Sequence, residues 1–197
     1  MPADEVDLDP SDLTVTWDGP EDPENPFNFP AKKKWTITLS ACYVCFIVGL
    51  NSTAIAGAAE GVLARFNVSD DNFPNDYWPV AAWNAGAAFA PLFGVPLLEQ
   101  FGVRTGFLLF YFLFFLFVIP QALANSFATL LVTRVIAGAL ASIVQNSVES
   151  VVADTFRTEA ERNLPITLFV YAFLAGFTVG PVVGAAIASR LYWRWCV

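Results

Sequence analysis

Long stretches without a charged residue constrain this chain more than any other feature of its sequence. Residues 35–59, 77–98 and 105–133 contain no Asp, Glu, Lys or Arg. As a helix, the first stretch of 25 residues is roughly 37 Å long at about 1.5 Å per residue, longer than the ~30 Å hydrocarbon core of a bilayer. Charged residues are only 14% of the chain, against about 25% in soluble domains. The sequence therefore predicts membrane-spanning helices.

Five spanning helices account for the apolar segments. The 29-residue stretch 105–133 is too long for one span, and Asn125 and Ser126 predict a turn inside it. The expected fold class is an all-α, polytopic membrane helix bundle. Its predicted helices cover residues 35–59, 77–98, 106–123, 127–152 and 165–188.

The first 31 residues differ in composition from the rest. Nine acidic residues lie within positions 1–24 with no basic residue among them, and apolar periodicity is missing. We therefore predict a disordered acidic tail at residues 1–31 and a transmembrane domain at residues 32–197. The 173 residues after position 24 carry a net charge of +1, from 10 basic minus 9 acidic residues. No basic face for nucleic acid is expected.

The basic residues predict the orientation in the membrane. Lys32, Lys33 and Lys34 stand directly before the first apolar stretch, which favours a cytoplasmic amino terminus. Six basic residues fall on the predicted inner side and three on the outer side. The outer loop, residues 60–76, then carries Asn67 in an Asn-Val-Ser acceptor triplet for N-glycosylation. The expected location is the plasma membrane, with the vacuolar membrane as the alternative.

The fifth predicted helix contains the most specific string in the chain, GFTVGPVVGA. Gly176, Gly180 and Gly184 recur every four residues on one helix face, where they let another backbone approach closely. Pro181 removes one backbone donor and favours a bend. The glycine spacing alone leaves a generic helix-packing face as the alternative. The full string GxxxGPxxG resembles the fifth-helix motif of antiporters of the major facilitator superfamily, with Ala185 in place of a final glycine.

A second string, LLVTRVIAG, resembles the LxxxRxxxG element in the fourth helix of the same family. It places Arg134 inside the hydrocarbon region, where an arginine costs about 2.5–3.5 kcal/mol and is expected to face the bundle interior or water. The resemblance implies a role in proton coupling for Arg134. The alternative is an arginine that extends to the lipid headgroups at the outer end of the helix.

Glu149 is an acidic residue within the same predicted helix, beside Gln145 and Asn146. Ionisable residues inside a membrane suggest a functional role, here proton or substrate handling. The alternative is that water reaches Glu149 near the inner end of the helix. At the outer end of the second helix, Trp78 and Trp83 are predicted to lie in the interfacial aromatic belt.

The connection after the second helix, PLLEQFGVR, resembles the cytoplasmic loop motif PLSExxGRR of fungal drug exporters. Glu99, Gly102 and Arg104 fit this motif, whereas a leucine and a valine replace its serine and its first arginine. The resemblance implies a cytoplasmic latch, for which Asp154 and Arg162 are the expected charge partners. The alternative is that these charges only set the membrane topology.

Three further strings resemble the same fungal group, in the same order along the chain. They are DPENP followed by KKKW, then ERNLPI, then WRW after the fifth helix, so that the resemblance covers the chain from residue 22 onward. It implies five helices of an amino-terminal six-helix half in a proton-coupled drug antiporter. The implied ligands are a small amphipathic compound and a proton, and no enzyme activity, cofactor or metal is expected.

Transporters of this family contain two six-helix halves, with the substrate held between them. With five predicted helices, we expect this chain to be a fragment that does not transport alone and needs the second half or a full-length partner. A hypothesis of a different class is a truncated membrane protein that acts by helix association with such a partner.

Overall fold

The chain is described here by a computed structural model, which covers residues 19, 21–69 and 75–196. Within these residues every regular element is a helix, which confirms the all-α class. The elements are η2 (Pro26–Asn28), α1 (Ala31–Ala54), η3 (Ile55–Ala58), α2 (Ala59–Phe66), α3 (Trp78–Phe89), α4 (Pro91–Phe101), α5 (Val103–Ala122), α6 (Phe127–Thr155), α7 (Glu159–Ala188) and η4 (Trp193–Cys196).

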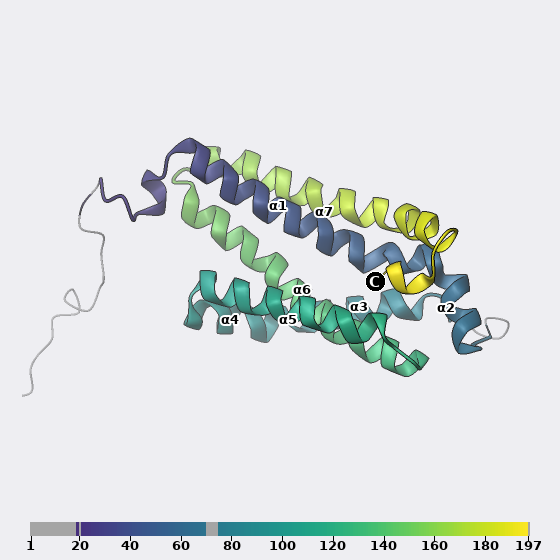
Figure 1. Ribbon diagram of the computed structural model, residues 1–197. Coiled ribbons are helices and arrows are strands. Elements are labelled where there is room, and N and C mark those ends of the chain that lie inside the picture. Colours follow the sequence, from purple (N-terminus) through teal and green to yellow (C-terminus); the bar gives the residue numbers. More distant parts are fainter. Residues whose placement is uncertain (1–18, 20, 70–74, 197) are drawn as a thin grey trace, which may run out of the picture.

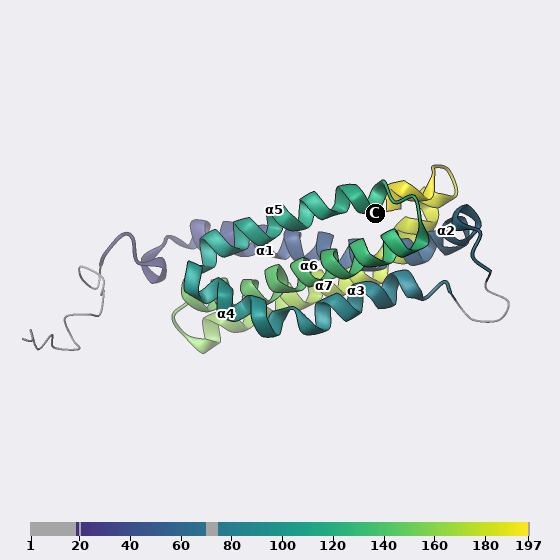
Figure 2. The same cartoon turned by 90° about the horizontal axis from the view of Figure 1, so that it is seen from below.

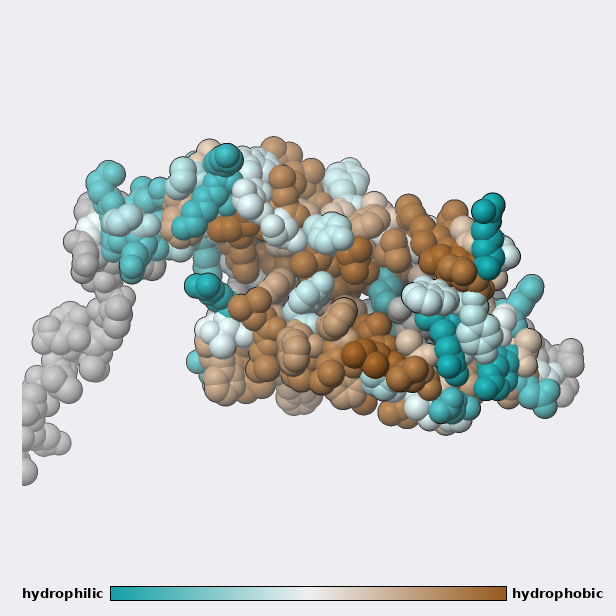
Figure 3. Space-filling model, viewed as in Figure 1, coloured by the Kyte–Doolittle hydropathy of each residue, from teal (hydrophilic) through white to brown (hydrophobic). Residues whose placement is uncertain are grey.

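The helices have the length and the surface of membrane spans. In the described part of the chain, four helical segments are long and apolar enough to cross a bilayer, and the bent pair α3–α4 makes a fifth when counted as one span. Hydrophobic residues cover the middle of the face shown in Figure 3, and hydrophilic residues gather toward its two ends. This is the expected polytopic membrane bundle.

Two tightly packed helix pairs form the centre of the bundle. Helix α1 lies along α7, and α3 lies along α6, which α5 also contacts (Figures 1 and 2). Gly176 on α7 abuts the Phe46 carbonyl, and Gly184 abuts that of Ala54, so α1 and α7 run in the same direction. In the second pair, Gly138 on α6 abuts the Trp83 carbonyl on α3. Missing side chains thus allow backbone-to-backbone contact in both pairs.

The second span is broken where the sequence predicted one helix over residues 77–98. Helices α3 and α4 meet at an angle of 49°. Pro91 is the first residue of α4 and has no N–H to donate to the Ala87 carbonyl, so the hydrogen-bond ladder is interrupted there. The chain then turns into α5 at Gly102, whose φ of 85° suits glycine.

Helix α7 begins at Glu159, six residues before the expected start at residue 165. The hydroxyl of Thr158 accepts a hydrogen bond from the Glu161 backbone N–H at 3.3 Å, and thereby caps the helix. The sequence TEAE has the spacing of a capping box, so this start was readable from the sequence.

Residues 21–30, expected in the disordered tail, form a defined entry segment that precedes α1. The Asn25 side chain accepts a hydrogen bond from the Phe27 N–H at 3.0 Å, and the Asn28 amide donates to the Asp22 carbonyl at 3.0 Å. Asparagine caps of this kind stabilise short turns, a local effect that the acidic composition obscured. Residues 1–18 and 20 of the predicted tail lie outside the described residues.

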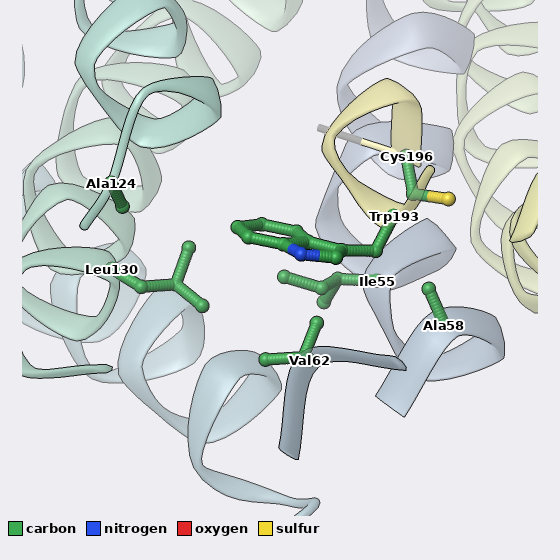
Figure 4. Packing of buried hydrophobic residues seen from close by; sticks show 7 residues of the cluster. All are labelled: Ile55, Ala58, Val62, Ala124, Leu130, Trp193 and Cys196. Atoms are coloured by element: carbon green, nitrogen blue, oxygen red, sulfur yellow. The ribbon is translucent and has the colours of Figure 1, made fainter. Parts of the chain in front are cut away.

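A buried cluster around Trp193 closes the end of the bundle where η3 and α2 lie. Its indole ring lies among Ile55, Val62 and Leu130, so η4 folds back onto η3, α2 and the start of α6 (Figure 4). The WRW string therefore contributes a core residue to the bundle.

The α1–α7 contact leads to a test of close packing. An added Cβ atom at Gly184 would collide with the Ala54 carbonyl, so we expect Gly184→Ala to force the helices apart and to lower the free energy of unfolding by about 1–3 kcal/mol. Reversible unfolding in SDS, followed by circular dichroism, measures this. Gly61→Ala is the matched control, because its Cβ would meet only the Trp193 Cβ at 3.7 Å. Equal stability of the two variants would contradict this packing.

Candidate functional site

Arg134 occupies the centre of the half of the bundle that contains η3 and α2. It lies two turns inside α6, and its side chain is 0% exposed. It therefore does not extend to the headgroups, which was the alternative interpretation of this residue. The guanidinium points to the junction of three helices, α1, α3 and α6.

Backbone carbonyl groups surround the Arg134 guanidinium. Its Nε donates to the Pro79 carbonyl at 2.9 Å, Nη1 to that of Asn51 at 3.2 Å and Nη2 to that of Ser52 at 2.5 Å. Asn51 and Ser52 lie in the last turn of α1, before the chain changes to the 3-10 helix η3. Carbonyl groups in the last turn of a helix lack regular helical donors and are free to accept other hydrogen bonds.

The charge of Arg134 has no acidic counterpart among the described side chains, since no salt bridge to it is formed there. Burial of an isolated cation is costly unless hydrogen bonds replace its hydration. Here the negative end of the α1 dipole faces the cation, and the Trp83 ring lies 4.9 Å from its Cζ. Trp83 is buried, not part of the interfacial belt as predicted, because it packs between Arg134 and Phe114. Trp78 is exposed.

A second contact joins α1 to the proline of the α7 string. Because Pro181 has no N–H, the carbonyl of Phe177, four residues earlier, loses its helical donor. The Thr53 hydroxyl on α1 donates to this carbonyl at 2.8 Å. Gly180 makes room for it, since an added Cβ would collide with the Thr53 Oγ1. Within this string, Pro181 thus leaves the Phe177 carbonyl free to accept a hydrogen bond, and Gly180 leaves space for the Thr53 hydroxyl that donates it.

The Arg134 and Thr53 contacts lie next to each other along α1. Arg134 binds the carbonyl groups of Asn51 and Ser52, and Thr53 is the following residue. One turn of α1 therefore connects α3 and α6 on one side with α7 on the other. The sequence motifs contain Arg134 and Pro181 but none of the hydrogen-bond partners at these two positions, because hydrogen bonds to distant backbone groups leave no pattern in a sequence.

Glu149 lies away from Arg134. It is exposed in the carboxyl-terminal half of α6, and the neighbouring Asn146 side chain donates to the Ser142 carbonyl of its own helix at 2.7 Å. The two residues are 15 positions apart, roughly 22 Å along a helix that rises about 1.5 Å per residue. The structure thus separates the two residues proposed for proton coupling.

The predicted latch residues lie in or beside the α4–α5 turn and the α6–α7 connection, at the end of the bundle where α1 starts (Figure 1). Arg104 and Asp154 are exposed, and Arg162 donates its Nε to the Phe156 carbonyl at 2.7 Å. Among the side chains that the structure describes, no salt bridge joins these residues. The side chain of Glu99 lies outside the described ones, and Gly102 forms the turn between α4 and α5.

Asn67, the predicted glycosylation site, is exposed at the end of α2. It adopts a left-handed conformation with φ of 53° and ends the helix. Its end of the bundle is opposite to that of Lys32, Lys33 and Lys34, as Figure 1 shows for the start of α1 and for α2.

Comparison with known proteins identifies the family of this bundle. The family model of the Major Facilitator Superfamily matches residues 39–197. The chain belongs to the major facilitator superfamily. It is therefore a multi-pass membrane protein of a transporter family, as the GxxxGPxxG and LxxxRxxxG strings predicted.

Relatives within the major facilitator superfamily are fungal transporters. The chain is 31% identical over 175 residues to an MFS-type transporter of Penicillium rubens. The aligned segment covers 89% of this chain and 31% of that relative. It is 32% identical over 191 residues to the cycloheximide resistance protein of Candida maltosa, an alignment that covers 93% of this chain and 34% of that relative. It is 30% identical over 187 residues to a multidrug transporter of Candida glabrata, an alignment that covers 92% of this chain and 31% of that relative. The chain thus spans about a third of the length of the curated relatives it matches.

The hydrogen bond between Thr53 and Phe177 predicts a coupled pair of substitutions. We expect Thr53→Val to leave the Phe177 carbonyl without a donor and to lower the free energy of unfolding by about 1–3 kcal/mol. Pro181→Ala restores an N–H four residues after Phe177, so Thr53→Val should cost less in a Pro181→Ala background. A double-mutant cycle in detergent measures this coupling.

Thr178→Val is the matched control, because Thr178 is exposed and its hydroxyl donates to the Leu174 carbonyl of its own helix. Additive effects of Thr53→Val and Pro181→Ala would show that the two residues act separately.

Proposed function

We propose that this chain is the amino-terminal part of a proton-coupled exporter of small amphipathic compounds, in which Arg134 tunes a protonation site. The observation that carries the proposal is a buried guanidinium hydrogen-bonded to two carbonyl groups in the last turn of α1 and one in the first turn of α3. A buried positive charge lowers the pKa of an acidic group that comes near it and so favours proton release. Because Arg134 bonds to α1 and α3 from α6, its effect on the pKa of such an acidic group depends on how these three helices are arranged.

The substrate class rests on the relatives. One is named a cycloheximide resistance protein and another a multidrug transporter. Export of small amphipathic compounds across the plasma membrane, or into the vacuole, is the activity that this similarity favours for a protein that contains the chain. In this proposal the amino terminus lies in the cytoplasm, which the three lysines in the first turn of α1 favour.

Transport by this chain requires more protein than the described bundle. Alternating access moves two six-helix halves against each other around the substrate. We propose that the parts corresponding to the remaining two thirds of the relatives come from the same polypeptide or from a full-length partner. The exposed apolar side chains along α7, among them Val170, Leu174 and Val182, are available for lipid or for helices of that second half.

A chimera tests the role of Arg134. Residues 22–197 would replace the aligned segment of the Candida maltosa cycloheximide resistance protein, expressed in a drug-sensitive yeast. We expect the chimera to support growth on cycloheximide, and Arg134→Ala to abolish proton-driven efflux while insertion into the membrane persists. Arg134→Lys keeps the charge but loses the planar donor geometry, so partial activity, lower by about tenfold, is expected.

Arg190→Ala is the control, because Arg190 is an exposed arginine at the outer end of α7. Efflux by Arg134→Ala equal to that of the unsubstituted chimera would remove Arg134 from the mechanism. An inactive chimera that is correctly inserted would argue against the exporter function of this segment.

Asn67 provides a test of orientation. With the amino terminus in the cytoplasm, the exposed Asn67 faces the lumen of the endoplasmic reticulum during synthesis and should be glycosylated. We expect a glycosidase-sensitive shift in gel mobility of the expressed chain that Asn67→Gln removes. Asn51→Gln, at an acceptor triplet within α1, should leave the shift unchanged. Absence of glycan at Asn67, together with glycan on an introduced site in the α4–α5 turn, would reverse the orientation.

A further inference from the structure

A cavity of about 470 Å³ opens at the inner end of the bundle, between the start of α1 and the start of α7. Sites for small ligands in proteins measure roughly 300–1,000 Å³. The walls come from the entry segment, α1, the residue after α6, and α7. The residues that define its chemistry are Phe29, Lys34, Trp35, Phe156, Glu161 and Leu164.

The entry segment is a fixed wall of this cavity. The Lys34 ammonium donates to the Phe27 carbonyl at 3.0 Å, and the Arg157 guanidinium lies 5.8 Å from the centre of the Phe27 ring. The Lys33 ammonium lies 3.3 Å from the centre of the Phe29 ring. These contacts attach residues 27–29 to α1 and to the α6–α7 connection. The cavity is therefore built from three separate parts of the chain.

The lining presents two opposite charges and a group of aromatic rings. Lys34 and Glu161 both face the cavity, and no salt bridge joins them among the described side chains. A lysine ammonium has three N–H donors, of which one is used by the Phe27 carbonyl. The Trp35 and Phe156 rings meet edge to face, with centres 6.2 Å apart. The cavity thus offers a cation, an anion and aromatic surface to one ligand.

The position of the cavity is that of the inner headgroup layer. Lys32 to Lys34 precede Trp35 at the start of α1, an arrangement typical of the cytoplasmic membrane interface. Leu164, one turn after Glu161 on α7, is exposed and apolar and marks the lipid side of the cavity. A molecule in the cavity would therefore have its polar part beside Lys34 and Glu161 and its apolar part along Leu164.

We propose that this cavity binds a zwitterionic phospholipid of the inner leaflet. The lipid phosphate would accept hydrogen bonds from the Lys34 ammonium, and its amine would lie beside the Glu161 carboxylate and the aromatic rings. Glu161 disfavours lipids with net negative charge, because its carboxylate repels them. This site is independent of the proposed transport and would anchor the entry segment to the membrane surface.

Native mass spectrometry of the full 197-residue chain tests the proposal. The chain is reconstituted in nanodiscs that contain equal fractions of phosphatidylethanolamine and phosphatidylglycerol, and the retained lipids are counted after release. We expect retention of a zwitterionic lipid over phosphatidylglycerol. Lys34→Ala and Glu161→Gln should each weaken this retention about tenfold, as expected for loss of one charged hydrogen bond.

Lys32→Ala and Glu159→Gln are the matched controls, because both residues are exposed in the same helix turns but do not line the cavity. Equal losses in the control variants, or preferred retention of phosphatidylglycerol, would overturn the site. Glu161→Gln keeps the proposal testable if Lys34→Ala also releases the entry segment. Displacement of the lipid by soluble phosphoethanolamine at matched concentration would overturn the assignment to a membrane lipid.

Discussion

The half of the bundle that contains η3 and α2 depends on the hydrogen bonds of the buried Arg134 guanidinium. Its hydrogen bonds reach the last turn of α1 and the first turn of α3, so one side chain connects three helices. No acidic side chain in the described part of the protein balances its charge. Backbone dipoles and the face of Trp83 replace the lost hydration of the guanidinium. Moving these backbone groups away would leave the buried charge without compensation.

Close backbone contact explains why the two helix pairs hold together in an apolar solvent. Lipid provides no hydrophobic force between helices, so packing and interhelical hydrogen bonds must hold them together. In the α1–α7 pair the glycine face brings the backbones into contact, and the Pro181 gap leaves an acceptor for Thr53. The proline that weakens α7 internally thus strengthens its contact with α1.

The end of the bundle where α1 starts is organised differently, by aromatic and cationic side chains. Phe27 and Phe29 of the entry segment are held by lysine and arginine cations, and Phe156 lies against Trp35. Cations and aromatic rings are the side chains that favour the headgroup layer. The cavity and the entry segment are therefore two consequences of the same local composition, whereas the opposite end of the bundle is closed by the apolar packing of Trp193.

The sequence by itself determined the membrane class, the five spans and the family, because uncharged length and the GxxxGPxxG and LxxxRxxxG strings are local properties of the chain. It also contained the capping box that starts α7, although composition and hydropathy predicted a start at residue 165. Only the tertiary structure decided that Trp83 is buried and that Glu149 lies far from Arg134. It also decided that Thr53 donates to the carbonyl group that Pro181 leaves without a helical donor. These facts depend on which helix faces meet, and on carbonyl groups that every residue carries and no sequence pattern distinguishes.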